Sequence, residues 1–110
     1  MTDIDSALKA IESAPNRDGL SDSLIALERE IRSILLAITF CEEAEDANDY
    51  FQTLDQVQTV LARLVFKKGL RVTHNLTEFV RDFDRIDDAD LRRHLFSKIK
   101  DGEYFLLQAT

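Results

Sequence analysis

Apolar residues recur every three or four positions along most of the chain, a spacing that places them on one face of an α-helix. The strongest pattern begins after Ser21, a typical helix cap, and ends near Phe40. A second pattern of the same period runs from Ala47 to Lys68 and is followed by Gly69, a common residue type just beyond a helix end. The apolar positions are Leu24, Leu27, Ile31, Ile34 and Ile38 in the first pattern and Tyr50, Phe51, Leu54, Val57, Leu61, Leu64 and Val65 in the second. Each pattern therefore predicts one amphipathic helix.

The two patterns favour an antiparallel hairpin of two helices over one long helix. No Gly or Pro lies between Ser21 and Lys68, so the sequence permits a continuous helix. Such a helix would be about 70 Å long, whereas a compact chain of this length has a radius of gyration of only about 13 Å. We therefore expect a break near residues 43–46, with Asp46 as the cap of the second helix. The alternative is one long helix whose apolar face is covered by a second copy of the chain.

A short amphipathic helix is predicted before the hairpin. Ile4, Leu8 and Ile11 lie four and three positions apart, so they share one face within residues 1–14. This helix must end before Pro15, because proline disfavours helical backbone at the preceding residue. A helix of about three turns is marginal in isolation, so it must pack against another element.

Two shorter helices are predicted within residues 75–100. Asn75 and Glu78 have the spacing of a capping box and begin the first of them. Asp87 or Asp88 is the expected cap of the second. The apolar positions that follow these caps are Leu76, Phe79, Val80, Phe83 and Ile86 in the first helix and Leu91, Leu95, Phe96 and Ile99 in the second.

Two segments look extended rather than helical, residues 70–73 and the apolar tail at residues 103–110. They could pair as short strands, or form a plain loop and a terminal arm. Together the elements predict an all-α fold: a single domain over residues 1–110, a bundle of four to five helices built on the long hairpin of residues 21–68, with a short terminal strand or arm.

Nearly the whole net charge lies in one part of the chain. The 110 residues contain 21 acidic and 14 basic residues, which gives a net charge of −7. No Lys or Arg lies between Ser33 and Ala62, and the acidic residues there are Glu42, Glu43, Glu45, Asp46, Asp49 and Asp55. A negative field repels phosphate backbones and anionic lipids, which argues against general nucleic-acid or membrane binding. We interpret this segment either as a solvated turn or as a docking surface for a basic partner.

The composition indicates a folded chain with one cysteine. It is 45% hydrophobic, and no apolar run approaches the roughly 20 residues that span a bilayer. The first residues lack the basic start and apolar stretch of a signal peptide, so we expect a cytoplasmic protein without a membrane partner. Cys41 can form neither an internal disulfide nor a cysteine-built zinc site, and its neighbours Glu42 and Glu43 would raise the pKa of its thiol. We therefore predict a structural role for Cys41.

Few residues are of the types that usually carry catalysis or bind metals. His74 and His94 are the only histidines, and neither belongs to a Glu-x-x-His metal motif. The aspartates from Asp82 onward imitate a calcium loop, but Arg93 stands where its bidentate glutamate belongs. We therefore predict no catalytic residue, no metal ligand and no cofactor. The alternative is a small metal-dependent hydrolase that uses the acidic cluster at residues 42–49.

A second alternative is a nucleic-acid-related regulator. The two predicted helices of residues 75–100 have the order of a helix-turn-helix, and the second carries the one locally basic surface. Against this, Asp87, Asp88 and Asp90 crowd the end of that helix that would meet the bases. An acidic mimic of DNA belongs to the same functional class. The candidate nucleic-acid residues are Arg92, Arg93, Lys98 and Lys100.

The function that the sequence favours is a non-enzymatic protein-interaction module, such as a small adaptor, regulator, chaperone or inhibitor. Aromatic residues beside a charged rim are typical of docking sites, and the aromatic candidates for such contacts are Tyr50, Phe66, Tyr104 and Phe105, although the interpretation that the sequence favours for each of them is that it fills the core. The expected partner is a protein with a basic surface, and a second copy of the chain is a further candidate. The candidate partner-binding residues are Glu42, Glu43, Glu45, Asp46, Asp49, Tyr50, Tyr104 and Phe105.

Overall fold

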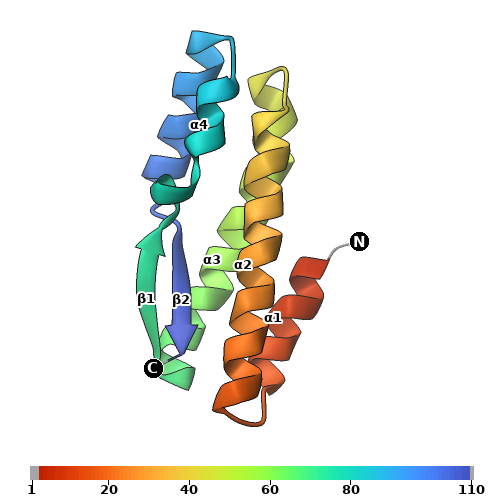
Figure 1. Cartoon of the computed structure of the whole chain (residues 1–110), viewed down its shortest axis with the longest axis vertical. Coiled ribbons are helices and arrows are strands. Elements are labelled where there is room, and N and C mark those ends of the chain that lie inside the picture. The colour runs from red at the N-terminus through yellow and green to blue at the C-terminus, as the bar shows by residue number, and fades with distance from the viewer. Residues whose placement is uncertain (1–2, 110) are drawn as a thin grey trace.

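Two long antiparallel helices form the frame of the molecule. In the computed structural model, which describes residues 3–109, α2 spans Arg17–Thr39 and α3 spans Asn48–Lys68. The two helices run in opposite directions and are joined at one end of the molecule (Figure 1). The predicted hairpin is confirmed, and the single long helix is not formed.

The apolar faces of the two long helices form the centre of the core. Leu27, Ile31 and Ile38 of α2 and Leu54 and Leu61 of α3 each expose 2% or less of their surface. All five lie at positions that the sequence pattern assigns to an apolar face. Because the burial of one such side chain contributes roughly 2 kcal/mol, this seam accounts for much of the driving force that pairs the helices.

Two further α-helices flank the hairpin on opposite sides (Figure 1). α1 spans Asp3–Ser13 and packs against α2, and α4 spans Ala89–Asp101. Their buried apolar residues are Ile4, Ala7 and Ile11 in α1 and Leu91, Leu95 and Ile99 in α4. The fold is therefore an all-α bundle of four α-helices with a small terminal sheet, as predicted. Within residues 3–109, no helix combines the length and the apolar character needed to cross a membrane.

α2 begins more than one turn before the predicted cap, Ser21. Its N-cap is Asn16, whose side-chain oxygen accepts a hydrogen bond from the backbone N–H of Gly19 at 2.8 Å. Asparagine is among the strongest N-cap residues, and it stands directly after Pro15. The helix therefore starts as soon as the chain has passed the proline, and the prediction of Ser21 as the cap is wrong.

The predicted cap of the second long helix is wrong as well. α3 is preceded by a short 3-10 helix, η1, at Ala44–Ala47, and the N-cap of η1 is Glu43 rather than Asp46. The Asp46 carboxylate accepts a hydrogen bond from the Glu43 backbone N–H at 3.2 Å, and the Glu43 side chain accepts one from the Asp46 backbone N–H in return. This reciprocal capping box holds the tip of the hairpin in one conformation.

Residues 76–85 do not form the predicted α-helix. They form two short 3-10 helices, η2 at Leu76–Phe79 and η3 at Arg81–Arg85. The capping box predicted at Asn75 is present and begins η2. Within residues 80–86, the buried apolar residues are Val80, Phe83 and Ile86. Because they lie three positions apart, a helix with three residues per turn aligns them on one face. The first α-helix that a helix-turn-helix requires is therefore not formed.

The tail of the chain pairs with the segment that follows α3. β1 spans Leu70–Asn75 and β2 spans Phe105–Ala109, and the two strands form an antiparallel sheet. Gly69 is the C-cap of α3 and has a φ of 64°, in the left-handed region that glycine adopts readily. It turns the chain from the helix directly into β1. Of the two possibilities that the sequence leaves open, paired strands are the one that forms.

Side-chain hydrogen bonds fasten the start of β2 to α3. The hydroxyl of Tyr104 donates to Asp55 Oδ1 at 2.6 Å, and the Tyr104 side chain is only 3% exposed. One residue later, the side chain of Gln58 accepts a hydrogen bond from the backbone N–H of Phe105 at 2.9 Å and donates one to its carbonyl at 3.3 Å. These contacts connect the C-terminal strand to a helix nearly 50 residues earlier in the chain, and they satisfy polar groups that would otherwise be buried without partners.

Replacing Tyr104 by phenylalanine is expected to lower the free energy of unfolding at neutral pH by about 1–2 kcal/mol, because the hydrogen bond to Asp55 is lost. Burial, together with the Asp55 carboxylate, raises the pKa of the Tyr104 hydroxyl. The unfolded chain therefore loses this proton at a lower pH than the folded protein does. The stability that Tyr104 contributes is complete below about pH 10 and declines as the pH rises further.

Urea unfolding near pH 8 and near pH 11 measures both effects of Tyr104→Phe. The variant should start from a lower stability but lose less of it between the two pH values than the wild-type protein, because it lacks the hydroxyl that titrates. Equal losses in the two proteins would mean that the Tyr104 hydroxyl has the same pKa in the folded and unfolded chains.

Candidate functional site

The acidic segment lies at the tip of the hairpin, between the last turn of α2 and the first turn of α3 (Figure 1, top). All of its carboxylates are exposed to solvent. They belong to Glu42, Glu43, Glu45, Asp46 and Asp49. Glu43 and Asp46 also hold the capping box, whereas Glu42, Glu45 and Asp49 have no such structural role. The structure therefore places the five predicted acidic residues together on one exposed turn.

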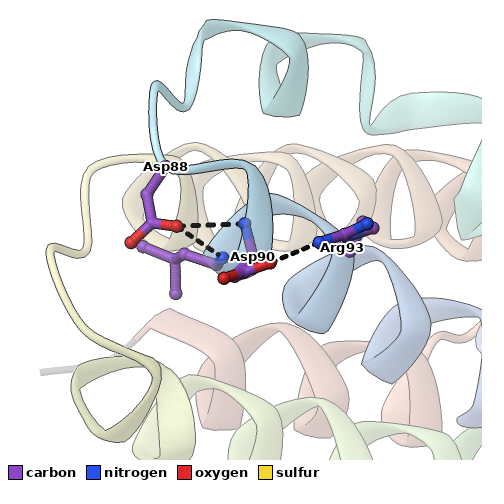
Figure 2. A network of polar contacts seen from close by, with 4 residues as sticks. Asp88, Asp90 and Arg93 are labelled. Atoms are coloured by element: carbon purple, nitrogen blue, oxygen red, sulfur yellow. Dashed lines mark hydrogen bonds and ion pairs between the residues drawn. The ribbon is translucent and has the colours of Figure 1, made fainter.

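Further carboxylates lie beside this tip, at the N-terminus of α4. The start of α4 reaches the same end of the molecule as the hairpin tip (Figure 1), and α4 contacts η1. The exposed carboxylates here belong to Asp87, Asp88 and Asp90. Figure 2 shows that Asp88 caps α4, since its Oδ1 accepts hydrogen bonds from the backbone N–H groups of Asp90 at 3.0 Å and of Leu91 at 3.1 Å. Asp90 in turn pairs with Arg93.

We refer to these residues together as the acidic end: Glu42, Glu43, Glu45, Asp46, Asp49, Asp87, Asp88 and Asp90. No Lys or Arg lies within residues 41–50 or 86–91, although Arg85 and Arg92 directly flank the second range and Arg93 pairs with Asp90 at the surface. Sequence reasoning found only the hairpin half of this surface. The α4 half is joined to it by tertiary packing, although the helix cap predicted at Asp87 or Asp88 already indicated where α4 begins.

A hollow of about 450 Å³ opens on the acidic end. It is lined by Ala37, Phe40, Cys41, Glu42, Asp46 and Tyr50. Phe40 is 74% exposed and Tyr50 is half-buried, so aromatic rings stand next to two carboxylates. This combination fits the side chain of a lysine or arginine, whose charged head meets a carboxylate while its apolar stem packs on a ring. Phe40 is a candidate contact that the sequence analysis missed.

Cys41 lies in the wall of this hollow but is not set up as a nucleophile. Burial raises the pKa of its thiol, and the Asp46 carboxylate raises it further. Its Sγ donates a hydrogen bond to the carbonyl of Ala37 at 3.6 Å. A reactive cysteine requires the opposite surroundings, with positive charge that stabilises the thiolate. The structural role that we predicted for Cys41 agrees with these contacts, although the side chain is half-buried rather than fully buried.

The four aromatic candidates differ in exposure and in position. Tyr104 is not available as a partner contact, because its side chain fills the core, as the sequence favoured, and is hydrogen-bonded to Asp55. Phe105 is half-buried at the start of β2 and is not part of the acidic end. Phe66 is 89% exposed near the end of α3, so it does not fill the core. Of the predicted aromatic residues, only Tyr50 lies beside the acidic tip.

The basic residues of α4 do not form one surface that could follow a nucleic acid. Arg92 is half-buried and donates a hydrogen bond from Nη1 to the carbonyl of Ile86 at 2.7 Å. Arg93 is paired with Asp90, and the Nζ of Lys98 lies 5.7 Å from the centre of the Phe51 ring on α3. Lys100 is exposed in the last turn of α4. Arg92 and Arg93 are therefore held by local partners near the start of α4, whereas Lys98 lies against α3 and Lys100 belongs to the last turn, so the four do not form one continuous basic surface.

Within the described part of the chain, no group of three or more His, Cys, Asp or Glu side chains is arranged so that it could hold a metal ion. His94 is exposed on α4, and the side chain of His74 lies outside the described part of the structure. The hydrolase alternative therefore has no geometric support within the acidic end.

Comparison with known proteins identifies a family for this fold and surface. A family model described as immunity protein CdiI-like matches residues 2–101, which covers the four helices, β1 and the acidic end. No curated protein and no solved structure matches the chain. Because the family match extends over more than nine-tenths of the sequence, the chain belongs to the CdiI-like immunity protein family.

Proposed function

We propose that this protein is an immunity protein that neutralises a protein toxin by binding it, with the acidic end as the main contact surface. Membership of the CdiI-like family supports the class of function. The observation that supports the location is the gathering of eight exposed carboxylates from two separate parts of the chain at one end of the molecule. The favoured function is therefore an inhibitor, one of the interaction modules that the sequence analysis considered.

The expected toxin surface is basic. A group of carboxylates attracts a positively charged partner over roughly a Debye length and increases the rate at which the two proteins meet. The hollow beside Phe40 then supplies a short-range contact for one lysine or arginine side chain of the toxin. A toxin whose basic surface binds its own substrate would lose access to that substrate while this surface is covered.

The capping box at the hairpin tip, the N-cap of α4 and the helix packing make the surface suitable for this role. The tip is held by the bonds between Glu43 and Asp46, and the neighbouring helix start is held by Asp88. Both segments pack on the buried core through Ala47 and Leu91, which are 0% and 8% exposed. A surface that is already ordered loses little conformational entropy when it binds, and this favours tight association.

The proposal is tested with the toxin domains that are encoded in the same genome as the chain. Each domain is expressed in a host with and without the protein, and growth is followed. We expect the protein to restore growth for one toxin domain and to form a one-to-one complex with it in isothermal titration calorimetry. If none of these domains is neutralised or bound, the proposed function is wrong.

A further inference from the structure

A second hollow lies beside α4, and arginines rather than carboxylates are the main charged residues in its lining. It is a cleft of about 580 Å³ between the 3-10 helices η2 and η3 and the outer face of α4. Val80 and Phe83 form its floor and are 6% and 2% exposed, and Phe96 of α4 stands in its wall with 41% of its surface exposed. The cleft therefore combines apolar and aromatic surface with polar side chains, and it is open to solvent.

Three guanidinium groups surround this apolar floor. They belong to Arg81, Arg92 and Arg93, so we call the hollow the arginine cleft. Arg92 is held in place by its hydrogen bond to the Ile86 carbonyl, and Arg93 by Asp90. Arg81 is exposed at the start of η3. A guanidinium group presents paired N–H donors whose geometry matches a carboxylate, and it retains its charge at every physiological pH.

The rim of the cleft also carries two carboxylates, which limits the kind of anion that fits. Glu78 accepts a hydrogen bond from the Asn75 backbone N–H at 3.1 Å, and Asp84 is exposed. Of the acidic end, Asp88 and Asp90 lie at the start of α4, the helix that carries Arg92 and Arg93. A long polyanion such as RNA would be repelled by these carboxylates as it leaves the cleft, whereas a single carboxylate on a peptide is small enough to pair with one arginine.

We propose that the arginine cleft binds a short acidic segment of the protein partner, in which a glutamate or aspartate pairs with Arg81 and a neighbouring apolar side chain packs on Phe96. The inference deepens the proposed function and rests on it for the identity of that partner as the toxin. The protein then contacts the toxin through two surfaces of opposite sign, the acidic end and the arginine cleft. Two such contacts fix the orientation of the complex, because a rotated toxin would bring like charges together.

The cleft is tested without the toxin, by selection from a phage library of random 12-residue peptides. Binders to the wild-type protein are depleted against the Arg81→Glu, Phe96→Ala double variant, so that only peptides that require the cleft remain. We expect these peptides to combine Asp or Glu with an aromatic or aliphatic residue. In fluorescence anisotropy, Arg81→Glu should weaken their binding by about tenfold or more. Arg63→Glu, at an exposed arginine of α3 outside the cleft, should leave it unchanged.

Three results would overturn the inference. They are the recovery of no peptide that requires the cleft, the recovery of cleft-dependent peptides without acidic residues, and tighter binding of a single-stranded RNA oligonucleotide that is likewise lost with Arg81→Glu. Circular dichroism of each variant shows whether it is folded, and Phe96→Ala alone provides a second variant that keeps all charges. Failure of this experiment leaves the proposed function intact, because the acidic end takes no part in the selection. Conversely, a toxin that is not bound would refute the proposed function while cleft-specific peptides could still be recovered.

Discussion

Simultaneous replacement of Glu42, Glu45 and Asp49 by lysine is expected to weaken the complex with the toxin by about a hundredfold or more at low salt. Like charges brought together in an interface cost several kcal/mol, and about 1.4 kcal/mol corresponds to a factor of ten in affinity. These three carboxylates are exposed and take no part in the capping box at the hairpin tip. The variant should therefore keep its fold, and the loss should appear in binding rather than in stability.

A matched control separates the position of the charges from their number. Asp5, Glu12 and Asp22 are exposed acidic residues on α1 and the start of α2, away from the acidic end (Figure 1). Their replacement by lysine changes the net charge by the same amount. Calorimetry at about 50 mM and about 300 mM salt should show a large, salt-dependent loss for the first triple variant and a small one for the control. Similar losses for both would show that only the net charge matters and that the acidic end is not the contact surface.

The long elements could be predicted because their signals are local. The period of the apolar residues in α2 and α3 continues over five or more turns, and the lysine pair before Gly69 marks the end of α3. Asp88 was one of two predicted caps for α4, and its carboxylate does receive the backbone N–H groups of the first turn. In each case, residues a few positions apart determine the outcome.

The predictions of local structure fail where the sequence allows two local conformations, or where a contact with a distant residue determines which one forms. Asn16 and Ser21 are both good caps, and the helix uses the earlier one because Pro15 only restricts the residue before itself. The spacing of Val80, Phe83 and Ile86 fits three residues per turn as well as it fits an α-helix, and packing on the core selects the tighter form. A pattern of apolar residues alone does not distinguish these alternatives.

In the candidate site as well, the features set by neighbouring residues could be predicted and those set by tertiary contacts could not. The hairpin half of the acidic end is a continuous run of sequence, so its place on one exposed turn followed from the predicted hairpin. The α4 half joins it only through the contact between α4 and η1. The hydrogen bond of Tyr104 could not be predicted, because its partner, Asp55, lies 49 positions earlier and nothing near Tyr104 in the sequence indicates it. Surfaces that are assembled from separate elements require the tertiary structure.

Replacement of Gly102 by alanine is expected to lower the free energy of unfolding by about 3 kcal/mol, at the upper end of the cost of overpacking a core. A Cβ at this position would lie 2.3 Å from Cε2 and 2.4 Å from Cζ of Tyr104, far inside van der Waals contact. The backbone of Gly102 is helical, with φ −72° and ψ −15°, so the cost comes from the clash and not from the dihedral angles. The ring cannot move aside without cost, because it is buried and its hydroxyl is bonded to Asp55.

Gly69→Ala is the matched comparison, because it adds the same methyl group in the opposite circumstances. Gly69 has a φ of 64°, and nothing lies within 4 Å of the added Cβ, so only the left-handed backbone is penalised, by about 1 kcal/mol. Urea unfolding of both variants should therefore place Gly102→Ala clearly below Gly69→Ala in stability. In a Tyr104→Ala background the ring is gone, and Gly102→Ala should then cost almost nothing. A penalty that persists in that background would show that the clash with Tyr104 is not its cause.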